Sequence, residues 1–160
     1  MSVAFTKEDS AETASETQLP DRPISPEPNL VTAAGLEALH AQLEAARLAY
    51  EAASAIEDIN ERRRQSAVPL RDLRYFRERV SSAQLMPAPT STDSIAFGST
   101  VTFVRDDGQR RTYRIVGEDE ADPKSGSISH ASPAARALVG KSIGNVVAIG
   151  GQDVEIVAIA

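Results

Sequence analysis

Carboxylates cluster between residues 118 and 122, where four of five positions are acidic. They are Glu118, Asp119, Glu120 and Asp122. Such a group attracts cations, but it lacks the alternating spacing of a calcium-binding loop. The cluster is therefore either a metal site of another kind or a merely solvated turn.

A second acidic group, Glu57, Asp58 and Glu61, comes directly before an arginine run. Glu57 and Glu61 are four positions apart, so on a helix they share one face and could hold a cation together. A solvated helix face explains the same spacing and is the commoner case.

The arginine run contains Arg62, Arg63 and Arg64, and Arg71 follows further along. Compensation of a helix dipole is one role for such a run. Three consecutive guanidinium groups exceed that need, and guanidinium groups bind phosphates and carboxylates well. The run therefore favours contact with nucleic-acid phosphate or with an acidic protein surface.

No set of side chains in the sequence suggests catalysis. His40 and His130 are single and far apart, and the chain has no cysteine. We expect surface positions for both histidines. We also expect no catalytic residue, no bound metal and no cofactor, so the chain is not expected to be an enzyme.

Composition narrows the class of protein. The 160 residues suit one ordinary domain or two small ones, and the net charge of −6 argues against a general nucleic-acid binder. No apolar run approaches the ~20 residues that span a bilayer, and the N-terminus lacks the pattern of a secretory signal. We expect a cytoplasmic protein without membrane contact.

The chain divides into four segments. Residues 1–29 are acidic and proline-rich with few large apolar residues, which predicts a disordered tail, either inert or able to dock through Phe5 or its prolines. Residues 30–86 are expected to form a helical hairpin, residues 87–95 a linker, and residues 96–160 a small second domain.

Periodicity supports the hairpin but leaves its turn open. Thr32 suits a helix N-cap, and apolar residues recur every three or four positions up to Ala53, as in a coiled coil. The chain reverses either at 65–69, beside Pro69, or earlier, near 52–56, in which case Pro69 only kinks the returning helix.

Beyond the linker the period changes to two. Strands are predicted at 100–105 and 111–116 around Asp107-Gly108, and at 146–149 and 154–159 around Gly150-Gly151. Between these hairpins lie an acidic patch, a short strand at 127–129, and a helix that Ser132-Pro133 starts and Gly140 ends. The fold class is α+β, with an antiparallel sheet and one short helix.

The order of features from Tyr113 to Lys141 resembles the C-terminal domain of the bacterial Gre family (GreA/GreB). The segments VTAAGLEALHAQLEA and RERVSSAQLM resemble the two ends of that family's helical hairpin. The resemblance implies an FKBP-like second domain and a monomer that binds core RNA polymerase at the rim of the secondary channel. The residues it places at the rim are Asp119, Glu120, Asp122, Ile128, Ser129, Ser132 and Pro133.

In active members of that family, an Asp and a nearby Glu at the hairpin tip help to hold a second Mg²⁺ at the polymerase active centre. This ion activates water to cut backtracked RNA. Counted without gaps from Val31, that acidic tip falls on Ser66–Pro69, which has no carboxylate. We therefore expect polymerase binding without cleavage, with Arg62, Arg63, Arg64 and Arg71 contacting the channel and, indirectly, nucleic acid.

Alternatives remain open. Within the same class, the chain would be a non-cleaving competitor of true Gre factors or a modulator of initiation. From another class, it would be an FKBP-like peptidyl-prolyl isomerase or chaperone, or a regulator of nucleoside diphosphate kinase. Fold alone does not separate these functions.

Overall fold

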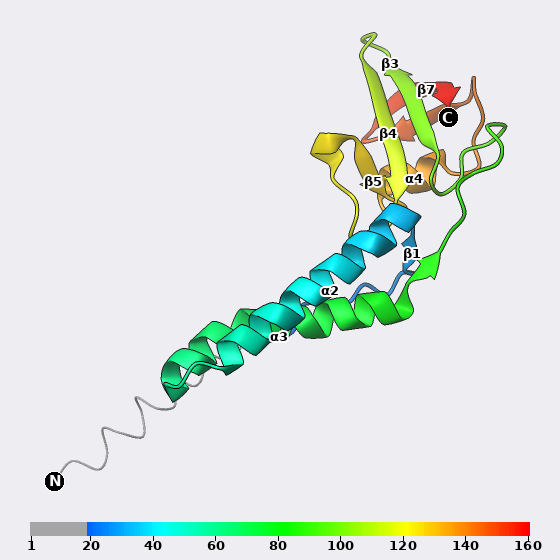
Figure 1. The fold of residues 1–160 in the computed structure, drawn as a ribbon. Coiled ribbons are helices and arrows are strands. Elements are labelled where there is room, and N and C mark those ends of the chain that lie inside the picture. The colour runs from blue at the N-terminus through cyan, green and yellow to red at the C-terminus, as the bar shows by residue number, and fades with distance from the viewer. Residues whose placement is uncertain (1–18) are drawn as a thin grey trace. The chain divides into compact units, whose positions relative to one another are not determined.

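A computed structural model describes residues 19–160 of the chain, in which two compact units form (Figure 1). Among the described residues, unit 1 consists of residues 19–26 together with Leu39–Ser81, and unit 2 consists of Glu27–Ala38 and Ser82–Ala160. Within residues 19–160, no helix is both long enough and apolar enough to cross a membrane.

Unit 1 contains most of a helical hairpin, as predicted, formed by α2 (Ala33–Ser54) and α3 (Ile59–Ser82). Leu39, Ala46 and Ala53 are buried on α2 at intervals of seven residues, which is the seam of a coiled coil. The helices have 22 and 24 residues, or about 33 and 36 Å at 1.5 Å per residue. The two arms are therefore nearly equal.

The hairpin reverses at residues 55–58, the earlier of the two places that the sequence left open, and Pro69 lies inside α3. Asp58 starts α3, because its Oδ1 accepts the Glu61 N–H at 2.8 Å and its carbonyl accepts the Arg62 N–H at 2.9 Å. The placement of the tip at Ser66–Pro69 is thus wrong, and so is the statement that the tip has no carboxylate.

The predicted tail also needs correction. Residues 1–18 lie outside the described residues, but residues 19–29 make specific contacts. The Arg22 guanidinium lies 3.8 Å from the centre of the Tyr75 ring and 3.4 Å from Asp72 Oδ1. Asn29 is buried and donates from Nδ2 to Ser82 Oγ at 3.1 Å. The composition of this segment predicted disorder because it has few large apolar residues. The contacts that order it need only a few polar side chains, which composition does not reveal.

Unit 2 is built on a five-stranded sheet in the order β5-β4-β3-β7-β6 (Figure 1). Its strands are β3 (Thr100–Arg105), β4 (Arg110–Val116), β5 (Ser127–Ser129), β6 (Val146–Ile149) and β7 (Gln152–Ile159). All neighbours are antiparallel except β4 and β5, which run parallel. The sheet is therefore mixed, because the chain between β4 and β5 crosses back before pairing.

Turns and caps in unit 2 follow the sequence signals. Gly108, Gly150 and Gly151 all have positive φ, as the two predicted hairpins require. Helix α4 (Pro133–Leu138) begins at Ser132, whose Oγ accepts the Ala135 N–H at 3.2 Å. It packs Ala135 and Leu138 into the core beside Phe103 and Ile156.

A small parallel pair of strands, β1 (Leu30–Val31) and β2 (Gln84–Leu85), was not predicted. Strands of two residues leave no periodic pattern in a sequence. Through this pair and the first turn of α2, residues before the hairpin become part of unit 2.

Candidate functional site

The acidic loop of unit 2 follows β4 directly and begins at Gly117. A Cβ at this position would lie 2.4 Å from the Leu30 carbonyl oxygen, so only glycine allows the loop to pass β1 so closely. The carboxylates of this loop make different contacts.

Glu120 is bound within the chain. Its Oε2 accepts a 2.7 Å hydrogen bond from Thr32 Oγ1, and Thr32 Oγ1 in turn accepts the Gly35 N–H at 2.9 Å. Thr32 is therefore the N-cap of α2, as predicted, and Glu120 fixes the orientation of that cap. A side chain engaged in this way has less freedom to meet a partner.

Asp122 organises the turn that leads to β5. Its carboxylate accepts the Ser125 hydroxyl at 2.6 Å, and its carbonyl accepts the backbone N–H groups of Ser125 and Ser127. The turn ends at Gly126, with φ of +90°. Asp122 nevertheless stays exposed, as does Asp119.

The remaining residues of the predicted rim surface separate into core, cap and surface. Ile128 is buried in the core, so its placement on a contact surface is wrong. The hydroxyl oxygens of Ser129 and Ser132 accept hydrogen bonds from the backbone N–H groups of Ala131 and Ala135, respectively. Pro133 is exposed at the start of α4. The exposed members, Asp119, Asp122 and Pro133, are called the loop surface below.

The hairpin tip carries the second acidic group. Glu57 and Asp58 lie in the reversal and are exposed, and Glu61 lies in the first turn of α3. Glu61 is engaged, because Oε2 is 2.7 Å from Arg64 Nη2 and Oε1 accepts from Gln65 at 2.9 Å. Among residues 19–160, no three His, Asp or Glu side chains gather closely enough to hold a metal ion by themselves.

The four arginines that were expected near the tip differ in position. Arg62 donates to the carbonyl oxygens of Ile56 and Glu57, Arg64 pairs with Glu61, and Arg63 is exposed in the same turn. Arg71 is 12 residues beyond the start of α3, about 18 Å along the helix axis. Arg71 therefore lies away from the tip, and its contact with the channel stays a prediction.

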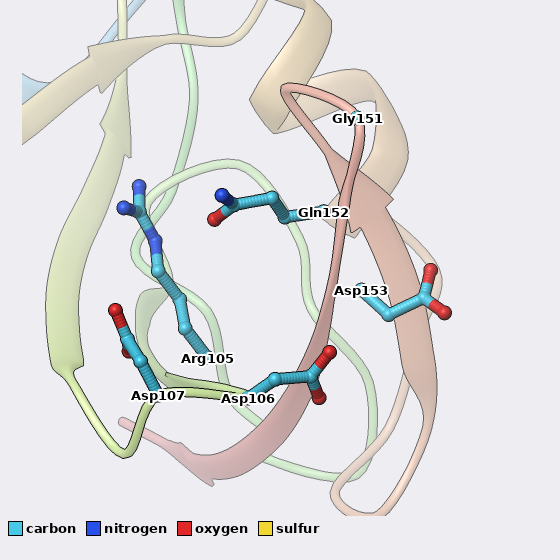
Figure 2. Close-up of a pocket in the computed structure, with 6 residues that line it drawn as sticks. All are labelled: Arg105, Asp106, Asp107, Gly151, Gln152 and Asp153. Carbon is cyan, nitrogen blue, oxygen red and sulfur yellow. The ribbon is translucent and has the colours of Figure 1, made fainter.

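Two hollows in unit 2 were not predicted. One hollow, of about 360 Å³, lies between the turns of the two β-hairpins, and Figure 2 shows the residues that line it: Arg105, Asp106, Asp107, Gly151, Gln152 and Asp153. Asp107 serves its turn there, since Oδ1 accepts the Gln109 N–H at 2.9 Å. The other, of about 380 Å³, is mostly apolar and includes Met86, Phe97 and Arg114.

The histidines do not share a site. His40 is exposed on α2. His130 packs edge-on against Phe97, 5.7 Å between ring centres, and within residues 19–160 its Nε2 is buried without a hydrogen-bond partner. His130 is thus partly exposed, and the surface position expected for it holds only in part.

The chain is similar in sequence to known transcription factors. The profile of the family described as "Transcription elongation factor, GreA/GreB, C-term" matches residues 89–160. A protein named Transcription elongation factor GreA from Azorhizobium caulinodans is 33% identical over 152 residues, covering 91% of this chain and 90% of that protein. One of the same name from Beijerinckia indica is 37% identical over 117 residues, 69% of each chain. The chain belongs to the GreA/GreB family.

Two further proteins are similar to the chain. A Vibrio parahaemolyticus protein named Transcription elongation factor GreA is 45% identical over 94 residues, and the match spans 58% of its length. The crystal structure of GreA factor homolog 1 (Gfh1) from Thermus thermophilus is 25% identical and covers 84% of this chain and 99% of that one, with a TM-score of 0.41.

Proposed function

We propose that the chain regulates transcription by binding core RNA polymerase and acting at the secondary channel through its hairpin tip. Family membership supports the class, since the relatives are named transcription elongation factors. The observation that carries the proposal is the reversal at residues 55–58, which puts Glu57 and Asp58 at the end of the hairpin.

The tip has the donor chemistry that Mg²⁺ prefers. Carboxylate oxygens are hard ligands, and Mg²⁺ in enzymes of nucleic-acid chemistry is held by only one or two protein carboxylates and by other oxygens. Asp58 uses Oδ1 to cap α3, which leaves Oδ2 for a further partner. Asp58, with Glu57 or Glu61 beside it, would supply ligands to an ion held mainly by polymerase. That ion would activate water for RNA cleavage.

This proposal differs from the expectation of a non-cleaving factor, because the absence of tip carboxylates was the reason for that expectation. One observation still favours a non-cleaving competitor. The Glu61 carboxylate is already shared by Arg64 and Gln65. The ion pair between Glu61 and Arg64 is exposed. Exposed ion pairs stabilise a protein by about 0–1 kcal/mol, so Glu61 can exchange this contact for a metal ion.

The loop surface of Asp119, Asp122 and Pro133 is proposed as the contact with the polymerase rim. Asp119 is the residue to test, because it is acidic and exposed on the loop surface. Charge reversal at a rim contact lowers the association rate and weakens binding.

The test is the affinity of the full chain for purified core RNA polymerase. We expect Asp119→Arg to weaken binding about tenfold or more, and the thermal midpoint measured in parallel checks that the variant is folded. Asp106→Arg is the matched control, because Asp106 is equally acidic and is exposed in the β3–β4 turn. Absence of binding by the wild-type chain would contradict the proposed function. Equal affinities for both variants would contradict the loop surface only.

A further inference from the structure

The side chain of Arg62, in the first turn of α3, is hydrogen-bonded to the loop at the hairpin tip. Its Nε donates to the Ile56 carbonyl oxygen at 2.7 Å, and its Nη2 donates to the Glu57 carbonyl oxygen at 2.9 Å. Both carbonyls belong to the four-residue reversal between α2 and α3. One planar guanidinium therefore spans two consecutive peptide groups of the loop.

The base of this side chain is itself fixed. The Arg62 N–H donates to the Asp58 carbonyl at 2.9 Å, and the Arg62 carbonyl accepts the Ser66 hydroxyl. Arg62 is thus anchored in the first turn of α3 while its guanidinium holds the loop that precedes the helix. Hydrogen bonds from a charged donor are roughly twice as strong as neutral ones, so this link is strong for an otherwise exposed turn.

We infer that Arg62 is a positioning residue, which fixes the backbone that carries Glu57 and Asp58 and so sets the direction of their carboxylates. The inference rests on the proposed function of the tip. It changes the role of Arg62 from a contact with the channel to a support within the chain, while Arg63 and Arg64 are exposed.

Two hydrogen bonds constrain Asp58 and the residue before it. The backbone N–H of Glu61, in the first turn of α3, donates to Asp58 Oδ1. The Arg62 guanidinium donates to the carbonyl oxygen of Glu57, the residue before Asp58. Lysine cannot replace this second constraint. Its ammonium group is a point charge on a flexible stem and cannot reproduce the planar pair of donors. Charge and geometry can therefore be separated by one conservative substitution.

The experiment compares Arg62→Lys with Arg77→Lys in the full chain. Arg77 is an exposed arginine on the same helix and lies far from the tip, so it serves as a matched control. The first readout is amide hydrogen exchange over residues 55–62 in the free protein. The second is the Mg²⁺ concentration that gives half-maximal cleavage of backtracked RNA with polymerase saturated by the factor.

For Arg62→Lys we expect about tenfold faster exchange in the loop, the size of effect given by losing one hydrogen bond to a charged group. We also expect a several-fold rise in the Mg²⁺ requirement, with unchanged affinity for polymerase. Arg77→Lys should match the wild type in every readout. A merely structural role would alter exchange without moving the Mg²⁺ requirement.

The outcomes separate the two claims. If the wild-type chain binds polymerase but gives no cleavage at any Mg²⁺ concentration, the proposed function of the tip fails, and the role of Arg62 in it fails too. If the wild type is active and Arg62→Lys equals it in exchange and in Mg²⁺ requirement, the inference about Arg62 fails and the proposed function stands.

Discussion

At the scale of single residues, neighbouring carboxylates of one acidic loop have different tasks. Glu120 binds the hydroxyl of Thr32, Asp122 holds its turn, and Asp119 faces solvent. Composition treats these acids as equivalent. Their difference arises from what the fold brings opposite each of them, here the start of a helix 88 positions away in sequence.

Thr32→Ala tests the first of these contacts. The substitution removes the N-cap of α2 and leaves Glu120 without its partner, so the free energy of unfolding should fall by about 1–2 kcal/mol. Urea denaturation measures this change. Thr32→Ser keeps the hydroxyl and should retain most of the stability. A serine variant as unstable as the alanine variant would mean that the hydroxyl contacts are not the cause.

Some of this residue-level detail was available in the sequence. Ser127-Ile128-Ser129 alternates polar and apolar residues, which predicts that Ile128 points into the core. The family resemblance instead suggested a surface position, and it was wrong. The pairing of Thr32 with Glu120 had no sequence signal, because long-range contacts between two polar side chains leave no periodic pattern.

At the scale of elements, the hairpin was predictable but its turn was not. The apolar period continues on both sides of residues 55–58, and the reversal contains neither glycine nor proline. Pro69 suggested a turn at residues 65–69, where helix α3 in fact continues. A usable signal was present, since Asp58 followed by Glu61 has the spacing of a capping box at a helix start.

Pro69→Ala tests the position of the turn. Proline inside a helix removes a hydrogen bond and costs up to about 3 kcal/mol relative to alanine. The variant should therefore raise the stability of the hairpin by about 1–3 kcal/mol, measured by helical circular dichroism in urea. Val68→Ala, at an exposed neighbouring position, should be nearly neutral. A loss of stability in Pro69→Ala would indicate that proline suits a turn there.

At the scale of the whole molecule, the segment before the hairpin contributes to folding. Arg22 stacks on Tyr75 and pairs with Asp72, and in unit 2 Glu27 pairs with Arg136 at 2.7 Å while Asn29 is buried. The sequence indicated a tail through residue 29 because the segment is acidic and rich in proline. Polar and cation–π contacts, rather than apolar burial, hold residues 21–29.

Deletion of residues 1–29 should accordingly lower the thermal midpoint. Losing a buried hydrogen bond and a cation–π contact removes roughly 2–3 kcal/mol, or about 5–10 °C for a chain of this size. Calorimetry measures the shift. Arg22→Ala in the full chain should reproduce a part of it. An unchanged midpoint in both proteins would restore the prediction of a tail that does not pack.

If the hairpin tip presents working carboxylates to polymerase, the rate of RNA cleavage in backtracked complexes at saturating protein should depend on them. Asparagine caps helices as well as aspartate does, so Asp58→Asn keeps the fold and removes only the charge. We predict that the wild-type chain accelerates cleavage. We also predict that Asp58→Asn lowers the rate about tenfold or more at unchanged affinity. Saturating binding by the wild type without any acceleration, together with inhibition of a cleaving Gre factor, would contradict this account.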